Sequence, residues 1–226
     1  VLDHSVASFS AGVDQDVLTI DFGKVVVNGG TRTAPFAIHN LNGTPSFTAA
    51  LDIDGASGSG DTSQLYTNLT PVANIPAGSS NGFLATLNPT LAGALSATYQ
   101  VSVSDQNLPG ATAGTALTIN LTATVIVRGD FNADGIVNWQ DIDLLGANLG
   151  GPDMLYDLTG DSTVNFADVK EMVYGVLGTR FGDNNTDGLV DLDNDLPLFM
   201  TGYGGGGSGW YYGDYTLNGA IDLDND

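Results

Sequence analysis

The sequence predicts a mainly β protein with a small α-helical part: a β-sandwich over residues 1–128, then tandem acidic loops and short helices over residues 129–226. Apolar and polar residues alternate in the first part, and a short acidic motif recurs four times in the second. The first part holds eight acidic and three basic residues, a net charge of −5, whereas the second holds eighteen and two, a net charge of −16. The length allows one or two domains, and this step in charge favours two.

The strands of the first part are predicted by a period of two in the hydrophobic pattern. In residues 117–125, for example, Leu117, Ile119 and Leu121 alternate with Thr and Asn, which places one face in the core and the other in water. The predicted strands are 18–22, 34–40, 46–54, 83–87, 99–103 and 117–125. The Gly- and Ser-rich segments "DGASGSGD" and "IPAGSSNG" between them are expected to be turns. About seven antiparallel strands in this length predict a sandwich with Greek-key connections.

One stretch of this part carries a family resemblance. The sequence "DFGKVVVNGGTRTAPFAIHNLNG" (21–43) resembles the opening of immunoglobulin-like domains found in many large bacterial surface proteins. The resemblance covers roughly residues 10–127. It implies an immunoglobulin-like β-sandwich in a secreted or cell-surface protein.

The acidic motif of the second part has four copies. They are "DFNADGIVNWQD" (130–141), "DLTGDSTVNFAD" (157–168), "DNNTDGLVDLDN" (183–194) and "DYTLNGAIDLDN" (214–225), called loops 1 to 4 below. Each has oxygen-bearing side chains at positions 1, 3, 5 and 9, a backbone carbonyl at position 7, and an acid or amide at position 12. This is the ligand spacing of an EF-hand-type calcium loop, with Gly at position 6 for the sharp turn.

Calcium is therefore the predicted cofactor, since like charges crowded in one short loop repel unless a cation lies among them. The chain has no Cys, which leaves oxygen as its plentiful metal ligand. The predicted ligands are Asp130, Asn132, Asp134, Ile136, Asn138 and Asp141 in loop 1; Asp157, Thr159, Asp161, Thr163, Asn165 and Asp168 in loop 2; Asp183, Asn185, Asp187, Leu189, Asp191, Asn194 and Asp195 in loop 3; and Asp214, Thr216, Asn218, Ala220 and Asp222 in loop 4.

The four copies are predicted to be unequal. Loop 2 has Ser162 where Gly belongs, at a cost of about 1 kcal/mol if this residue needs a positive φ. Loop 3 has Asn194 at position 12, so that either Asp195 substitutes through a shifted turn or the affinity drops. Loop 4 is expected to be the weakest or least complete, because the sequence stops at Asp226 before an exit helix. Loop 1 is expected to bind calcium most tightly.

Short helices are predicted after the first two loops. Residues 140–150 can place Ile142, Leu145 and Leu149 on one stripe, and residues 167–178 can do the same with Val169, Met172, Val173 and Leu177. A loop followed directly by a helix, in tandem, resembles the type I dockerin repeats of secreted bacterial proteins. The resemblance covers residues 129–226 and rests on "GDFNADGIVNWQD" (129–141) and "FGDNNTDGLVDLD" (181–193).

The resemblance implies docking onto a cohesin of another polypeptide, but the recognition positions differ. Members that dock commonly carry small polar residues at loop positions 10 and 11 and a basic pair further along the helix. Here these places hold Trp139-Gln140 and Phe166-Ala167, then Gly146-Ala147 and Val173-Tyr174. Bulky apolar residues are expected to pack against the chain itself or against a like subunit.

Several other functions are disfavoured by the sequence. A net charge of −21 argues against nucleic acid and anionic membrane surfaces as partners, and no apolar run is long enough to span a bilayer. No catalytic motif is present, so we expect no enzyme. The segment "GGGGSG" (204–209) is interpreted as a linker, and Trp139 and Trp210 are expected to pack beside the loops rather than stack on sugar rings.

The resulting hypothesis is a non-enzymatic, extracellular, calcium-binding structural protein, a subunit of a homopolymeric surface fibre or matrix. The alternative is a dockerin module on a cohesin-like surface protein. A head-to-tail assembly is predicted because residues 1–10, with Val1, Leu2, Val6 and Phe9, have little local chain to pack against. Such a segment could pair with the sheet edge of a neighbour, or loop 4 could be completed by a neighbour's ligands.

Overall fold

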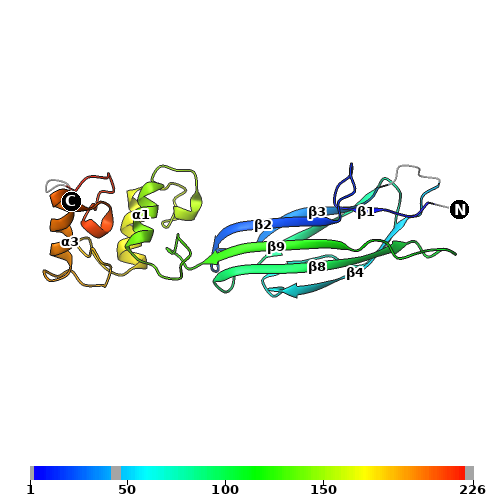
Figure 1. Ribbon diagram of the computed structural model, residues 1–226, viewed down its shortest axis with the longest axis horizontal. Helices are drawn as coiled ribbons and strands as arrows, with labels where there is room; N and C mark the ends of the chain where they lie inside the picture. Colours follow the sequence, from blue (N-terminus) through cyan, green and yellow to red (C-terminus); the bar gives the residue numbers. More distant parts are fainter. Residues whose placement is uncertain (1–2, 42–46, 222–226) are drawn as a thin grey trace. The chain divides into compact units, whose positions relative to one another are not determined.

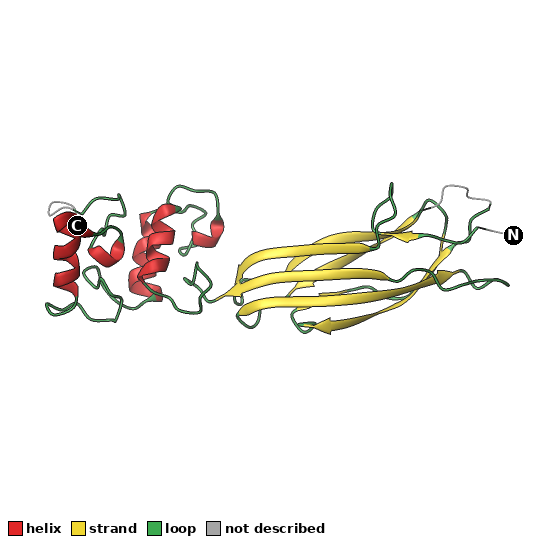
Figure 2. Cartoon of the chain, in the orientation of Figure 1, coloured by secondary structure: helices red, strands yellow, loops and turns green. Residues whose placement is uncertain are grey.

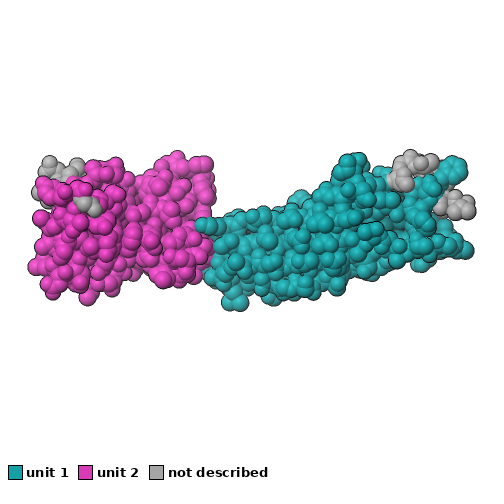
Figure 3. All heavy atoms as spheres, viewed as in Figure 1, with its two compact units in different colours: residues 1–125 teal, residues 126–226 magenta. Residues whose placement is uncertain are grey.

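The computed structural model describes residues 3–41 and 47–221 of the chain. The chain divides into two compact units, residues 1–125 and 126–226, each with its own hydrophobic core (Figure 3). Figure 2 shows that the first unit is built from strands and the second from short helices and loops. None of the helices within the described residues is both long and apolar enough to cross a lipid bilayer.

Two sheets form the first unit (Figure 1). One has the order β1-β3-β7-β5, with bounds Ala7–Ser8, Arg32–Asn40, Ser80–Leu87 and Leu65–Thr67. The other has the order β2-β9-β8-β4-β6, with bounds Val17–Val26, Leu117–Ile126, Gly93–Asp105, Leu51–Gly60 and Val72–Ile75. The prediction of a mainly β first part with two sheets is confirmed.

The core of this unit lies between the two sheets and follows the predicted alternation. Along strand β9, Leu117, Ile119 and Leu121 are inaccessible to solvent, while Thr118 and Asn120 between them are partly exposed. On the opposite sheet, Ile38, Ala85 and Leu87 are equally buried and belong to the same core. A period of two in the sequence has thus become one buried face per strand.

The segment predicted as a turn at residues 54–61 is instead the second half of strand β4. Its glycines are needed there: a Cβ on Gly58 would lie 2.6 Å from the ring of Tyr99, and one on Gly60 would lie 2.3 Å from the carbonyl oxygen of Ser96. The hydroxyl of Tyr99 donates a hydrogen bond to the carbonyl of Leu65. Pairing with β8 as far as Gly60 therefore overrides the weak strand propensity of these residues.

The N-terminal segment corrects a second prediction. Residues 3–10 pack against chain that is distant in sequence: β1 pairs with β3, Asp3 bridges to Thr48, and Phe9 lies 6.3 Å from Phe36 between ring centroids. The predicted apolar residues Val1 and Leu2 lie outside the described residues. Residues 3–10 therefore belong to the first unit, where β1 is an edge strand of its sheet.

The second unit holds α1 (Trp139–Ala147), α2 (Phe166–Glu171), α3 (Asp195–Thr201) and shorter helical turns. The turns are η1 (Met154–Tyr156), η2 (Met172–Val176), which continues α2, η3 (Gly202–Gly206), which continues α3, and η4 (Trp210–Tyr212). The predicted apolar stripes are confirmed, because Ile142 and Leu145 of α1 and Val169, Met172 and Val173 after loop 2 are all buried. In segment 204–209, interpreted as a linker, Gly205 already has a non-helical φ of 84°, and the chain leaves η3 after Gly206.

Candidate metal centres

The four predicted loops share one backbone conformation over their first six residues. In every loop the residues at positions 4 and 6 have a left-handed φ: Ala133 (65°) and Gly135 (89°), Gly160 (75°) and Ser162 (68°), Thr186 (57°) and Gly188 (93°), Leu217 (54°) and Gly219 (84°). Such a φ is uncommon for residues other than Gly. Its recurrence at the same two positions shows that the four loops follow the same path, and that Ser162 has the strained φ expected for it.

The first Asp of each loop organises that path. Its carboxylate accepts the backbone N–H groups of the residues at positions 5 and 6: in loop 1, those of Asp134 and Gly135, both at 3.1 Å. The same pair of hydrogen bonds recurs at Asp157, Asp183 and Asp214. These carboxylates thus lie at the centre of their loops.

The last Asp closes the loop and begins the helix. In loop 1, Asp141 is fully buried, and its carboxylate accepts the N–H groups of Phe131 at 2.7 Å, Asn132 at 3.1 Å and Asn138 at 3.0 Å. Asp168 accepts the corresponding N–H groups of Thr159 and Asn165 in loop 2. Burial raises the pKa of Asp141, although these hydrogen bonds oppose the shift.

Loop 3 is closed by Asp195, one residue later than in loops 1 and 2. Its buried carboxylate accepts the N–H of Asn184 at 2.8 Å and that of Asp191 at 2.8 Å. Asn194 instead donates from its side chain to Asp191. Of the two predicted alternatives, the structure therefore has the shifted turn, and Asp195 occupies the place that Asp141 and Asp168 hold.

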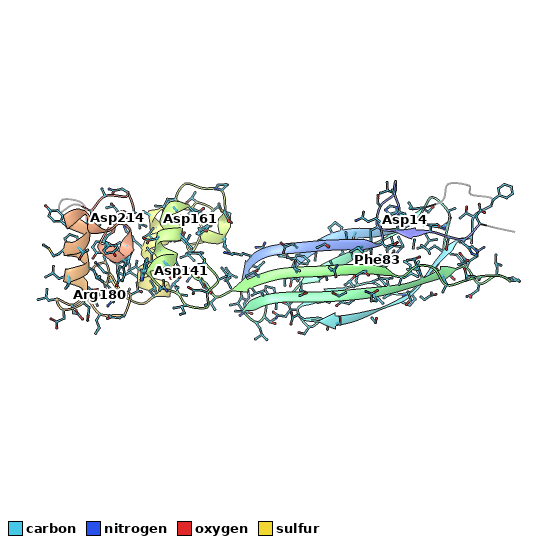
Figure 4. The ribbon with its side chains drawn as sticks, viewed as in Figure 1. Asp14, Phe83, Asp141, Asp161, Arg180 and Asp214 are labelled. Atoms are coloured by element: carbon cyan, nitrogen blue, oxygen red, sulfur yellow. The ribbon has the colours of Figure 1, made fainter. Side chains whose placement is uncertain are left out.

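The remaining predicted ligands lie at the rim of the loops, as the labelled Asp161 illustrates in Figure 4. Hydrogen bonds from neighbouring residues of their own loops, Thr163 to Asp161 and Asn194 to Asp191, lower the pKa of both exposed carboxylates. The side chains of Ile136 and Leu189 at position 7 are 62% and 64% exposed. Asp222 of loop 4 lies outside the described residues.

Among the described residues, no ion pair joins a loop carboxylate to a basic side chain. Arg128 pairs instead with Glu171. Nor does the described part of the chain contain a group of three or more His, Cys, Asp or Glu side chains placed to hold one metal ion. The carboxylates instead turn toward backbone N–H groups.

The donor chemistry nevertheless fits a hard divalent cation. Every side-chain donor at positions 1, 3, 5, 9 and 12 of loops 1 and 2 is a carboxylate, amide or hydroxyl oxygen. An ionised carboxylate offers about four lone-pair sites, so that one which accepts two N–H groups keeps acceptor capacity. Calcium accepts such mixed oxygen ligands in flexible geometry.

Buried aromatic residues pack between the loops, and one polar residue that contacts them was not predicted from the sequence. Trp210 is fully buried, as predicted, with Phe181 and Tyr215 at 5.2 and 5.1 Å between ring centroids. Trp139 packs on Tyr211 at 4.8 Å. The missed residue is Asn184, which is buried at position 2 of loop 3, where loops 1 and 2 have an apolar residue. A polar residue at a position that is apolar in loops 1 and 2 was the signal in the sequence that could have identified Asn184.

Comparison with known proteins adds structural likenesses alone. No protein-family model matches the chain, and no curated protein matches it significantly. Similar solved structures include PapD-like domain 7 of human CEP192, at 14% identity and TM-score 0.39, covering 48% of this chain and 81% of that one. WR4, an MSP family member of C. elegans, matches at 8% identity and TM-score 0.30, covering 45% and 92%.

The Vibrio cholerae VesB protease matches at 13% identity and TM-score 0.32, covering 47% of this chain and 30% of the protease. This likeness therefore spans less than a third of the protease's own length. The mainly β character of the chain rests on its own strand pairing, in two sheets within residues 3–41 and 47–125.

Proposed function

We propose that the chain is a non-enzymatic, extracellular structural protein in which residues 126–226 fold around calcium ions held by loops 1 to 4, as dockerin-like repeats. The observation that carries the proposal is the equivalence of the four loops, each with a central Asp and left-handed residues at positions 4 and 6. Residues 129–226 have a net charge of −16, so that bound cations would reduce the repulsion between their carboxylates.

Calcium titration of the full chain tests this proposal. Both tryptophans lie in the second unit, so that tryptophan emission reports on that unit alone. Chelation should shift the emission of the buried Trp210 to longer wavelength and reduce the helical far-UV signal. An ion at about 100 times its dissociation constant adds about 2.7 kcal/mol of stability per site. Identical unfolding curves with calcium and with a chelator would show the proposal to be wrong.

The proposed role is that of a subunit in a homopolymeric surface fibre or matrix. What supports a contact with another polypeptide is the set of exposed apolar side chains around loop 3 and α3: Leu189, Val190, Leu192, Leu196, Met200 and Tyr203. Several of them line a pocket of about 230 Å³ together with Phe199. We propose this surface as the assembly contact because its apolar side chains are exposed to solvent.

Sedimentation at millimolar calcium distinguishes the two candidate roles. Self-association that is lost on chelation, and in the double variant Leu192→Gln and Met200→Gln, supports the fibre. Leu91→Gln is the matched control, because Leu91 is 68% exposed on the first unit. A monomer that is retained by an immobilised cohesin supports instead the alternative, docking onto a cohesin-like surface protein.

A further inference from the structure

Trp210 occupies a position between three of the four loops. Its indole Nε1 donates a hydrogen bond to the backbone carbonyl of Asp183, the first residue of loop 3, at 2.9 Å. Its backbone N–H donates to the carboxylate of Asp143 on α1 at 2.7 Å. Its own carbonyl accepts the N–H of Gly213, directly before loop 4. One buried residue therefore contacts the start of loop 3, the helix that follows loop 1, and the approach to loop 4.

The segment "GGGGSG" is shaped to permit these contacts. Gly209 has φ 79°, and a Cβ at this position would lie 2.6 Å from a carboxylate oxygen of Asp143. A Cβ on Gly207 would lie 2.3 Å from the ring of Tyr212. Neither position has room for a side chain. The glycine at 209 therefore allows the Asp143 carboxylate to reach the backbone of Trp210, and the glycine at 207 allows the Tyr212 ring to pack against the segment.

Helix α1 in turn depends on loop 1. Asp141 accepts three N–H groups of loop 1, including that of Asn138, and Asn138 caps the helix. Asp143 lies two residues further, in the middle of α1. A change in the closure of loop 1 therefore moves the carboxylate that holds Trp210.

A second link joins loops 3 and 4. The hydroxyl of Tyr215, at position 2 of loop 4, donates to the side-chain oxygen of the fully buried Asn184 in loop 3. The backbone N–H of Asn184 donates to the closing carboxylate of Asp195. The Tyr215 ring also packs on Trp210. The same aromatic pair thus contacts the first two residues of loop 3, and Asn184 connects this contact to the closing Asp195.

We propose that Trp210 is a positioning residue that couples ion binding in loop 3 to ion binding in loop 1, through Asp143 and α1. The inference rests on the proposed calcium function and adds to it that the loops do not fill independently. An ion that orders loop 1 fixes Asp143, Asp143 fixes Trp210, and Trp210 holds the Asp183 carbonyl in the conformation that loop 3 adopts when closed. Binding at one loop then raises the affinity of the other, and the effect is reciprocal.

A double-mutant cycle on the full chain tests the coupling. In the Trp139→Phe background, Trp210 is the sole tryptophan, so that its emission during a calcium titration reports on loop 3 and its surroundings. Asp134→Ala weakens loop 1 without contact to Trp210. We expect it to raise the calcium midpoint reported by Trp210 by about fivefold or more, the range typical of coupled sites.

The matched variants are Asp143→Asn, which keeps an oxygen acceptor for the Trp210 N–H, and Asp143→Ala, which removes it. The effect of Asp134→Ala should persist in D143N and disappear in D143A. An equal effect in both backgrounds, or no effect with Asp143 intact, overturns the coupling while leaving the calcium proposal in place. Absence of any calcium response in the parent chain overturns both.

Trp210→Phe provides an independent measurement in case D143A does not fold. It keeps an aromatic ring in the core but removes the hydrogen bond to Asp183. Calcium calorimetry of the full chain should then change from cooperative to independent binding, while Trp139→Phe leaves the cooperativity unchanged. Cooperative binding in W210F that equals the wild type contradicts the role assigned to the indole N–H.

Discussion

The carboxylate of Asp195 accepts the backbone N–H of Asp191 at 2.8 Å, four residues before it in loop 3. In loops 1 and 2 the closing Asp accepts the corresponding N–H from the residue three positions before it, which is Asn138 in loop 1 and Asn165 in loop 2. Loop 3 therefore contains one additional residue between its ninth-position ligand and its closing carboxylate. Despite the extra residue, the closing Asp still accepts the N–H groups of the residues at positions 2 and 9 of loop 3.

Asp195→Asn should weaken loop 3, whereas Asn194→Ala should not. The amide would place an N–H₂ group against one of two buried backbone N–H donors, at a cost of about 1–3 kcal/mol. Asn194 is exposed and bonds only within the rim of the loop. The measurements are the urea midpoint at saturating calcium and the calcium midpoint by tryptophan emission. Equal effects of the two substitutions would contradict this assignment.

Ser162→Gly should stabilise the second unit by about 1 kcal/mol, because Ser162 has a φ of 68° that costs a non-Gly residue about this much. The reciprocal variant Gly135→Ser should destabilise by a similar amount. Gly135 has a φ of 89°, and a Cβ added there meets no atom within 4 Å. The substitution therefore measures the cost of the backbone conformation without a contribution from steric overlap. Urea unfolding followed by tryptophan emission measures both changes, and shifts of the same sign would contradict the explanation.

Acidification should destabilise the first unit through Asp105. Burial raises the pKa of this carboxyl, but hydrogen bonds from His4, Ser5 and Thr112 outweigh it and hold the pKa well below its usual range. A lowered folded pKa contributes stability above the unfolded value of about 4, and this stability is lost as pH falls from there toward the folded pKa.

The difference in melting temperature between the wild type and Asp105→Asn should therefore shrink as the pH falls below about 4. Asp54→Asn is the control, since Asp54 is an exposed carboxylate on strand β4 of the same sheet. Calorimetry of the full chain measures both. A difference that stays constant from pH 6 to about pH 2 would show that Asp105 contributes nothing through its charge.

Asp134→Ala should reduce calcium affinity more than Asn218→Ala, although both residues stand at position 5. Loop 1 has three predicted carboxylate ligands, Asp130, Asp134 and Asp141, and charge count is a main determinant of affinity in such loops. Asn218 contributes a neutral amide oxygen. Calcium titration by calorimetry compares the two, and a larger loss with Asn218→Ala would reverse the predicted order of the loops.

Strands and helices with one buried face could be predicted because their apolar residues recur with a regular spacing in the sequence. Strand β9 and the stripe after loop 2 follow this rule. The second half of β4 does not, because Gly58 lies against the ring of Tyr99 and Gly60 against the carbonyl of Ser96, both on the neighbouring strand and distant in sequence. The pairing of residues 3–10 was missed for the same reason.

The candidate site was predictable where the repeat is regular and not where it changes. The left-handed φ of Ser162 follows from alignment with Gly135. The choice between Asn194 and Asp195 depended on the length of the turn, which spacing alone left open. The roles of Asp143 and Gly209 depend on a contact across 66 residues of sequence, and no local pattern marks it.

The hydrogen bond from the indole of Trp210 to Asp183 also has an optical consequence. A terbium ion is a hard cation that prefers oxygen ligands, and it emits strongly when a nearby indole absorbs light and transfers the energy to it. In loop 3 the indole lies in direct contact with the loop backbone. In the W139F chain, terbium bound there should luminesce on tryptophan excitation, and calcium should quench the signal by displacement. Trp210 can therefore serve as the sensitiser that reports ion binding in loop 3.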